Sequence, residues 1–198
     1  MLDWLKNIQK EYPEFWKTYL EKMDKKSNRY VAFTLETTGL NSRKDVILSI
    51  AAIGIVQDQV LIGDVFEIAI PQYKYLHDNG ITHDFVLESK MPKLAEPAAI
   101  ENFIAFIENA VLVGHRTYFD VEMLNEVLEK LGCGRLRNEA LDIEIMYKKV
   151  HDLSEKSIAL DEMAKAYKLP VTEHVSPTDD AYNIALMFLK LKSKLGLK

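Results

Sequence analysis

The chain has 198 residues, of which 48% are hydrophobic and 28% are charged, and its formal net charge is −5. This length is sufficient for one domain with a well-buried core, and the composition is that of an ordinary soluble globular protein. The negative charge argues against a protein that holds nucleic acid through a globally basic surface. It does not exclude an enzyme that meets phosphates through metal ions or a local basic patch.

Two further features indicate the compartment. No apolar run approaches the length of a membrane span, and the first residues lack the continuous apolar core of a signal peptide. The single cysteine, Cys133, cannot form a disulfide within the chain, which suits a reducing environment. We therefore expect a cytoplasmic protein that does not act at a membrane.

The first predicted element is an amphipathic helix from Pro13 to Lys25, in which aromatic and aliphatic residues recur at helical spacing. Proline is tolerated near a helix start because its missing N–H would be unpaired there anyway. We expect the aromatic side chains to pack on the rest of the chain, with a partner-binding arm as the alternative. Residues 1–28 are therefore predicted to be an N-terminal helical extension, and residues 29–198 the main domain.

Three strands are predicted next, separated by short polar turns. They cover Tyr30–Leu35, Val46–Val56 and Val60–Ile70 and are rich in β-branched and aliphatic residues. Short turns between consecutive strands predict an antiparallel three-stranded meander. The following segment, Pro71–Pro92, shows no regular period and is predicted to be an irregular polar loop.

Helices and one further strand follow the loop. The predicted elements are a helix over Pro97–Ala110, a strand over Val111–Gly114, and helices over Phe119–Leu131, Ile143–Val150, Ile158–Tyr167 and about Thr178–Lys192. Asp142 is a natural N-cap for the helix that follows it. A meander followed by alternating helices and a strand predicts an α/β fold, in which a mixed central sheet is flanked by helices.

The end of the first strand carries the first candidate site. Side chains alternate along a strand, so Thr34 and Glu36 share one face. An acid at the carboxyl end of a central strand is well placed to bind a metal or another ligand. A solvated residue at a strand end is an equally good interpretation of Glu36 from the spacing alone.

The second candidate is Asp120, in the helix that follows the strand Val111–Gly114. At about 100° per residue it falls near the middle of that helix's apolar face. An acid directed at a core costs free energy unless it is paired, hydrogen-bonded or bound to metal. We therefore favour a ligand over a first-turn acid that only complements the helix dipole.

Three segments resemble the three motifs of the DEDD 3′–5′ exonucleases, the family of the epsilon proofreading subunit of bacterial DNA polymerase III and of RNase T. The first family motif, D-x-E-T-T-G-L, corresponds to the segment from Thr34 to Leu40, where Thr34 replaces the first acid. The second, H-N-x-x-F-D, corresponds to the segment from His115 to Asp120, where Arg116 replaces the usual Asn.

The third motif, H-x-x-x-x-D-A, fits the segment from His174 to Ala181 in two registers. Asp179 has the right spacing from His174, whereas Asp180 is the acid followed by Ala181. Helical periodicity puts Asp180 at the edge of the apolar face and Asp179 on the solvent side. We therefore take Asp180 as the ligand and Asp179 as a solvated or capping residue, which leaves His174 one residue out of place.

The resemblance covers most of the chain from residue 29 and implies a ribonuclease-H-like fold with an exonuclease-like domain over 29–198. It also implies phosphodiester hydrolysis with two Mg²⁺ or Mn²⁺ ions. Glu36, Asp120, Asp180 and the position of Thr34 would hold the metal, and His174 would act with Glu36 in catalysis. Because the Thr34 hydroxyl is neutral and a weak ligand, we expect weakened or lost catalysis, with one ion or none in a degenerate site.

The same resemblance implies contacts with 3′ ends of single-stranded DNA or RNA, and the sequence does not decide between the two. The implied binding residues are Thr37, Thr38, Gly39, Leu40, His115, Tyr118 and Phe119, with Tyr118 or Phe119 stacking on a base. Two alternatives are a relative that binds nucleic acid without cutting it, and a protein-interaction module that docks on a DNA polymerase subunit.

Overall fold

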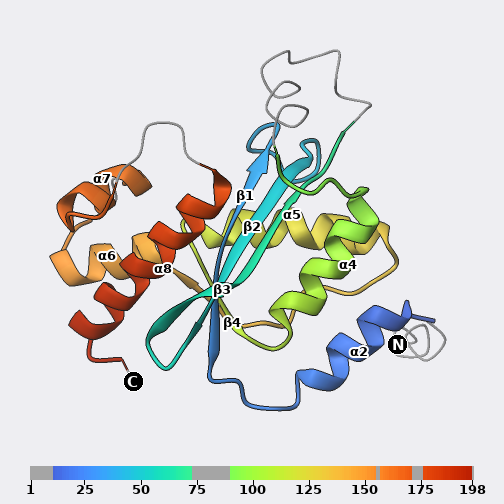
Figure 1. Ribbon diagram of the computed structural model, residues 1–198, viewed down its shortest axis with the longest axis horizontal. Helices are drawn as coiled ribbons and strands as arrows, with labels where there is room; N and C mark the ends of the chain where they lie inside the picture. The colour runs from blue at the N-terminus through green and yellow to red at the C-terminus, as the bar shows by residue number, and fades with distance from the viewer. Residues whose placement is uncertain (1–10, 73–89, 155–156, 171–175, 198) are drawn as a thin grey trace, which may run out of the picture.

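The computed structural model of the chain describes residues 11–72, 90–154, 157–170 and 176–197. At its centre is a five-stranded sheet with the order β3-β2-β1-β4-β5 (Figure 1). The strands are β1 (Arg29–Thr37), β2 (Ile47–Val56), β3 (Gln59–Ala69), β4 (Val111–Gly114) and β5 (Ala140–Asp142). β1, β2 and β3 form the predicted antiparallel meander, and β4 and β5 are parallel to β1. The mixed sheet predicted from the sequence is therefore confirmed.

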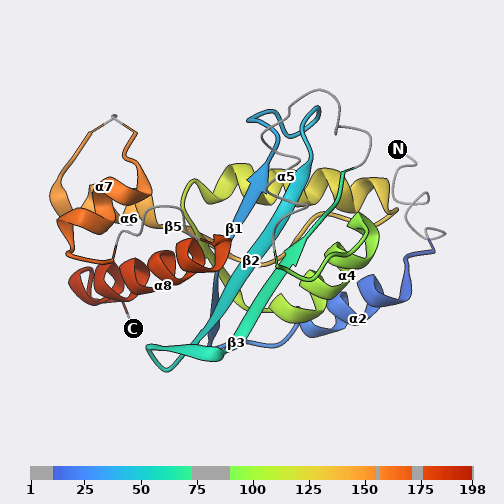
Figure 2. The same ribbon diagram turned by 45° about the horizontal axis from the view of Figure 1, so that its top comes forward.

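Helices cover both faces of this sheet (Figures 1 and 2). One face packs on α2 (Glu14–Lys22), α4 (Glu96–Ile107) and α5 (Thr117–Lys130), and the other on α6 (Ile143–His151), α7 (Leu160–Ala166) and α8 (Pro177–Lys194). Alternation along β1 explains the division, because Phe33 and Leu35 belong to the first core and Ala32 to the second. β2 is buried along almost its whole length because both of its faces are covered.

The N-terminal helix α2 packs on the domain, as expected. Trp16 and Tyr19 are buried in the same core as Phe33. The Tyr19 hydroxyl donates to Asn138 Oδ1 at 2.8 Å and accepts from the Arg137 amide at 2.7 Å. These contacts fix α2 beside the loop that leads into β5. The division of the chain at residue 28 stays a prediction.

The strand β5 was not predicted from the sequence. Its three residues are too few to show an alternating pattern, and it runs directly into α6. Asp142 ends the strand and caps α6, as expected, because its carboxylate accepts from the Glu144 amide at 2.8 Å. Most of the loop predicted over Pro71–Pro92 lies outside the described residues.

Among the described residues, no helix is both long and apolar enough to cross a membrane.

Candidate active site

Glu36 lies at the carboxyl end of β1, directly opposite Ser49 on β2. It is partly buried, and burial raises the pKa of its carboxyl group. The nearby charge of Asp180 raises the pKa of Glu36 further. Glu36 is therefore neither fully solvated nor fully buried, and its role as a ligand stays a prediction.

Asp120 lies in the first turn of α5, which begins shortly after β4 ends at the same edge of the sheet. Its side chain faces inward as predicted, since the residue is only 8% exposed. Burial raises the pKa of Asp120 well above its ordinary value, and the charges of Glu36 and Asp142 add to the rise. Among the described residues, no cationic side chain pairs with the Asp120 carboxylate to stabilise its charge.

The two acids at the start of α8 have different environments. Asp179 is exposed and its carboxylate accepts from the Ser176 amide at 3.3 Å, so it caps the helix as anticipated. Asp180 is partly buried, and burial raises its pKa. The charges of Asp161 and Asp179 raise the pKa of Asp180 further, while His115 lowers it. His174 lies outside the described residues.

Glu36 is thus brought within electrostatic range of Asp180 and of Asp120, which belong to two distant segments. The charge of Asp180 acts on Glu36, and the charge of Glu36 acts on Asp120. A divalent cation would relieve this repulsion, and carboxylate oxygens are the ligands that Mg²⁺ prefers. Among the described residues, however, no three His, Cys, Asp or Glu side chains already enclose a metal position. The donor chemistry fits a divalent cation, and the set of ligands is open.

Thr34 lies two residues before Glu36 on the same face of β1 and is partly buried. It is the position at which the resemblance places a carboxylate. Its neutral hydroxyl offers a weak ligand there, which is consistent with the open donor set.

The loop after β1 is held by its own hydrogen bonds. Thr37 Oγ1 donates to the Gly39 carbonyl at 2.8 Å, and Thr38 Oγ1 donates to Asp45 Oδ1 at 2.9 Å. A Cβ atom on Gly39 would lie 2.7 Å from Asp45 Oδ2, so a larger residue there would displace the Asp45 carboxylate that accepts from Thr38. Leu40 is 84% exposed at the tip of the loop. The two threonines therefore shape the loop, and Leu40 is the side chain that it presents.

The candidate stacking residues differ in exposure. Tyr118 is 79% exposed, whereas Phe119 is partly buried against the core between α5 and the sheet. His115 is also largely buried, with Nε2 2.8 Å from the Ile158 carbonyl and 3.5 Å from the Glu144 carboxylate. Tyr118 is thus the ring most available to a base.

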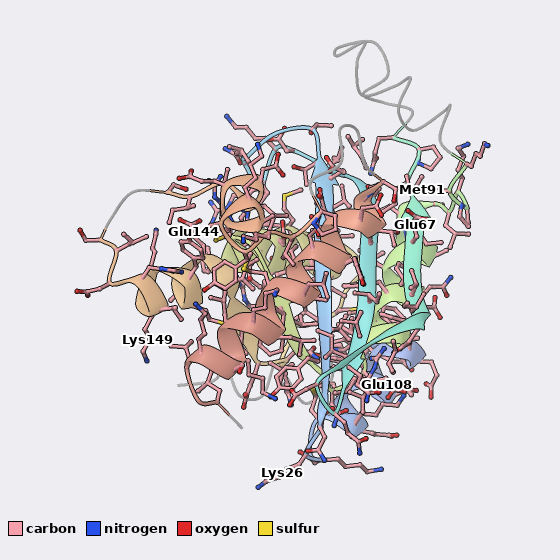
Figure 3. The ribbon with its side chains drawn as sticks, turned by 60° about the vertical axis from the view of Figure 1, so that its left-hand side comes forward. Lys26, Glu67, Met91, Glu108, Glu144 and Lys149 are labelled. Carbon is pink, nitrogen blue, oxygen red and sulfur yellow. The ribbon has the colours of Figure 1, made fainter. Side chains whose placement is uncertain are left out.

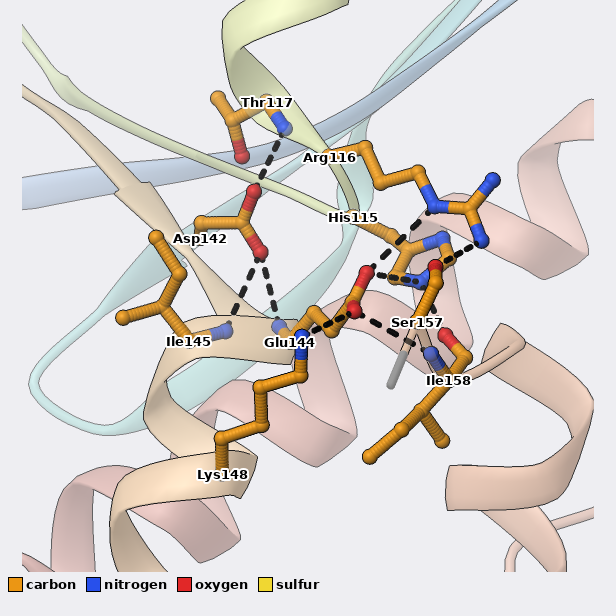
Figure 4. Close-up of polar contacts among 9 residues, drawn as sticks. All are labelled: His115, Arg116, Thr117, Asp142, Glu144, Ile145, Lys148, Ser157 and Ile158. Carbon is orange, nitrogen blue, oxygen red and sulfur yellow. Dashed lines mark hydrogen bonds and ion pairs between the residues drawn. The ribbon is translucent and has the colours of Figure 1, made fainter. Parts of the chain in front are cut away.

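A polar cluster centred on Glu144 was not found from the sequence (Figure 4). The buried Glu144 carboxylate accepts from the Ile158 amide at 3.1 Å, from Lys148 Nζ at 2.7 Å and from Arg116 Nε at 3.4 Å. Burial by itself would raise the pKa of Glu144, but these hydrogen bonds and the charge of Lys148 hold it below its ordinary value. The available signal was Arg116, a charged residue at the motif position where the family has Asn, although its side chain is 53% exposed.

The cluster fixes the start of α5. Arg116 has a φ of 58°, a conformation that L residues rarely adopt, and its guanidinium donates to Ser157 Oγ at 2.6 Å. Asp142 Oδ2 accepts from the Thr117 amide at 2.9 Å. These contacts hold the first turn of α5, and with it Asp120, against α6.

Removing the charge of Glu144 is expected to destabilise the fold. Glu144→Gln should lower the free energy of unfolding by about 2 kcal/mol near neutral pH, because Lys148 and Arg116 lose their shared partner. Since the folded pKa is depressed, this stabilisation is present at neutral pH and is lost as the pH falls below about 4.5. Denaturant unfolding at neutral pH and at a pH below about 4.5 measures the difference in stability between Glu144→Gln and the natural protein. The exposed Glu101→Gln is the control. An equal loss at acid pH would contradict the charge-based explanation.

The comparisons with known proteins agree with this geometry. Residues 31–188 match the family model described as exonuclease. The DNA polymerase III PolC-type protein of Caldanaerobacter subterraneus subsp. tengcongensis is 31% identical over 172 residues, which cover 84% of this chain and 12% of that protein. The PolC-type protein of Lacticaseibacillus paracasei is 31% identical over 166 residues, which cover 81% and 11%. The chain thus spans only about 12% of the length of these curated relatives.

Solved structures share the fold at lower sequence identity. E. coli exonuclease I in complex with a dT13 oligonucleotide has a TM-score of 0.65 and is 17% identical, and the match covers 86% of this chain and 42% of that chain. The ExoI/SSB-Ct complex gives the same TM-score, identity and coverage. The matched family model, the strand order and the positions of the three motifs agree, and the chain belongs to the DEDD-type 3′–5′ exonuclease family.

Proposed function

We propose that this chain binds 3′ ends of single-stranded DNA or RNA and hydrolyses them by the two-metal route, with catalysis weakened because Thr34 replaces the bridging acid. The observation that supports this proposal best is that Glu36, Asp120 and Asp180 come from three distant segments and that burial raises the pKa of each, while the charge of Asp180 adds to the rise at Glu36 and the charge of Glu36 adds to the rise at Asp120. Acids that repel one another at one end of a sheet are suited to bind cations and poorly suited to stabilise an empty site.

In this proposal Glu36, Asp120 and Asp180 hold Mg²⁺ or Mn²⁺, and Thr34 contributes only its hydroxyl. When bound, such ions would supply positive charge for the phosphodiester and lower the pKa of the attacking water. His174 accepts the proton from that water. With Thr34 in place of an acid, the site binds a first ion more tightly than a second. A site that holds one ion or none cuts slowly or not at all.

The nucleic-acid contacts in this proposal come from few side chains. Leu40 and Tyr118 are exposed large apolar residues, and each offers a surface on which a terminal base can pack. Thr37, Thr38 and Gly39 hold the loop that presents Leu40, while His115 and Phe119 support the site from inside. Because the net charge is −5, the phosphates are met through the bound cations and not through a basic surface.

A second candidate function is association with a DNA polymerase subunit in the cytoplasm. The relatives with 31% identity are DNA polymerase III PolC-type proteins, in which the matching segment is a small part of a much longer chain. A non-catalytic binding or interaction module would keep the fold and lose the dependence on metal. Binding to single strands that falls with rising salt would favour the nucleic-acid module over the protein-interaction module.

Degradation of a 5′-labelled single-stranded oligonucleotide in Mg²⁺ and in Mn²⁺ tests the proposal. The natural protein should shorten the strand slowly from its 3′ end, and Glu36→Ala should lower that rate by about 100-fold, since one charged ligand is lost. Glu101→Ala, at an exposed position on α4, is the matched control and should cut like the natural protein. If the natural protein neither cuts nor binds single strands, the interaction module replaces the proposed function.

A further inference from the structure

Three buried side-chain oxygens have no hydrogen-bond partner among the described residues. They are Ser49 Oγ, Glu67 Oε1 and Thr178 Oγ1. Unsatisfied buried polar atoms are rare and costly, so each calls for an explanation. Ser49 is 0% exposed and lies opposite Glu36, and Thr178 lies in the first turn of α8 beside Asp179 and Asp180. Thr178 therefore belongs to the helix that carries Asp180, and Ser49 lies on the strand paired with that of Glu36.

The strand register places the third atom on the same face. Thr34 on β1 lies opposite Ala51 on β2, and Ala51 lies opposite Glu67 on β3. Directly opposed residues in antiparallel strands point to the same side of a sheet. Thr34, Ala51 and Glu67 therefore form one row across the strands, and Glu36 and Ser49 belong to the next row.

Burial on β3 supports this assignment independently. Phe66 and Ile68 pack in the core of the opposite face, together with α4. Alternation then directs Glu67 to the face on which α8 packs. Figure 3 shows Glu67 at the end of β3 that lies nearest the start of α8.

A small residue separates Thr34 from Glu67 in this row. The α-carbons of Thr34 and Glu67 are separated by two strand spacings, about 10 Å in total. Ala51, between them, is fully buried in the core on which α8 packs and carries only a methyl group, so its own side chain takes up little of the path between them. A glutamate on the outer strand can extend across an alanine, whereas it could not cross a large residue.

We propose that Glu67 supplies the carboxylate that Thr34 lacks, by extending across Ala51 toward the cation held by Glu36. The inference rests on the proposed function and names the fourth acid of the same site. Three observations support it together. The row of Thr34 lacks an acid, the same row holds a buried carboxylate oxygen of Glu67 that has no hydrogen-bond partner among the described residues, and the neighbouring row of Glu36 holds the unpartnered Ser49 hydroxyl. In the filled site the Ser49 hydroxyl donates to one of these carboxylates.

Mn²⁺ binding to the full chain tests this assignment without reference to hydrolysis. Calorimetry should show that Glu67→Gln weakens Mn²⁺ binding by about tenfold or more, since a supporting carboxylate of the site is lost. Glu101→Gln is the matched control and should bind Mn²⁺ like the natural protein. Thermal unfolding in EDTA should show Glu67→Gln folded and no less stable than the natural protein, because the variant removes a buried charge without changing the side-chain shape.

A double-mutant cycle with Thr34→Asp makes the test specific. Once a carboxylate is restored in the same row, adding Glu67→Gln should change Mn²⁺ affinity by no more than about twofold. Equal losses in both backgrounds would show that Glu67 does not replace the missing acid. If Glu67→Gln binds Mn²⁺ normally while Glu36→Ala does not, the inference fails and the proposed function stands. If Glu36→Ala also binds normally, both fail.

Discussion

Thr34→Asp is expected to raise the rate of 3′-end hydrolysis by about 1,000-fold in Mg²⁺, which corresponds to about 4 kcal/mol of transition-state stabilisation. Thr34 occupies the row and the face from which a carboxylate would join Glu36, and its neutral hydroxyl is a weak ligand for a hard cation. In the proposed function, the acids around it, Glu36, Asp120 and Asp180, hold the metal. A carboxylate on β1 itself is therefore the ligand that position 34 of the natural chain lacks.

The same substitution should destabilise the fold when no metal is bound. A new carboxylate beside Glu36, whose pKa is already raised, should lower the stability in EDTA by about 1–2 kcal/mol near neutral pH. For a chain of this size each kcal/mol corresponds to about 2–4 °C in Tm. Thermal unfolding in EDTA measures this loss of stability, and thermal unfolding in Mn²⁺ measures how far the bound metal offsets it. Thr34→Asn, which is uncharged and of similar shape, should show neither effect, and equal hydrolysis by the two variants would refute the argument from charge.

Local periodicity was sufficient to predict most of the helices and strands. It was also sufficient to predict which way Asp120, Asp179 and Asp180 face. The apolar face of α5 predicted that Asp120 points inward, and it is buried. The phase of α8 separated Asp180 from Asp179, and Asp179 is exposed and completes the capping box with the N-cap residue Ser176. These predictions succeeded because each depends on residues within one or two turns of the same helix.

Contacts between distant segments could not be predicted in this way. The Glu144 cluster joins Arg116, Ser157 and Ile158, which are separated from Glu144 by 28, 13 and 14 positions in the sequence, and nothing local links them. The position of Glu67 in the row of Thr34 could not be predicted for the same reason. Alternation along β3 shows that it faces away from Phe66, but only the register shows that it stands in the row of Thr34. A bulge between Glu36 and Thr37 shifts that register, and a sequence alone does not reveal such a shift.

Asp120→Asn is expected to abolish hydrolysis, with a loss of at least about 1,000-fold, and to stabilise the metal-free protein by about 1–2 kcal/mol near neutral pH. Asp120 is buried, and the charges of Glu36 and Asp142 oppose its ionisation. The amide keeps the shape of the side chain and removes the charge. An acid that destabilises its own fold and is indispensable to the reaction is the expected signature of a ligand kept for function.

The pH dependence separates this explanation from a general packing effect. Because the folded pKa of Asp120 is raised, the folded protein keeps a proton that the unfolded chain releases above pH 3.8. The free energy of unfolding in EDTA should therefore fall as the pH rises from that value through the raised pKa, and then level off. Glu36 and Asp180 contribute with the same sign. Denaturant titrations across this range should show a shallower fall for Asp120→Asn, and saturating Mn²⁺ should remove most of the fall in the natural protein. Parallel curves for the two proteins would mean that Asp120 does not carry the buried charge on which this account of the site depends.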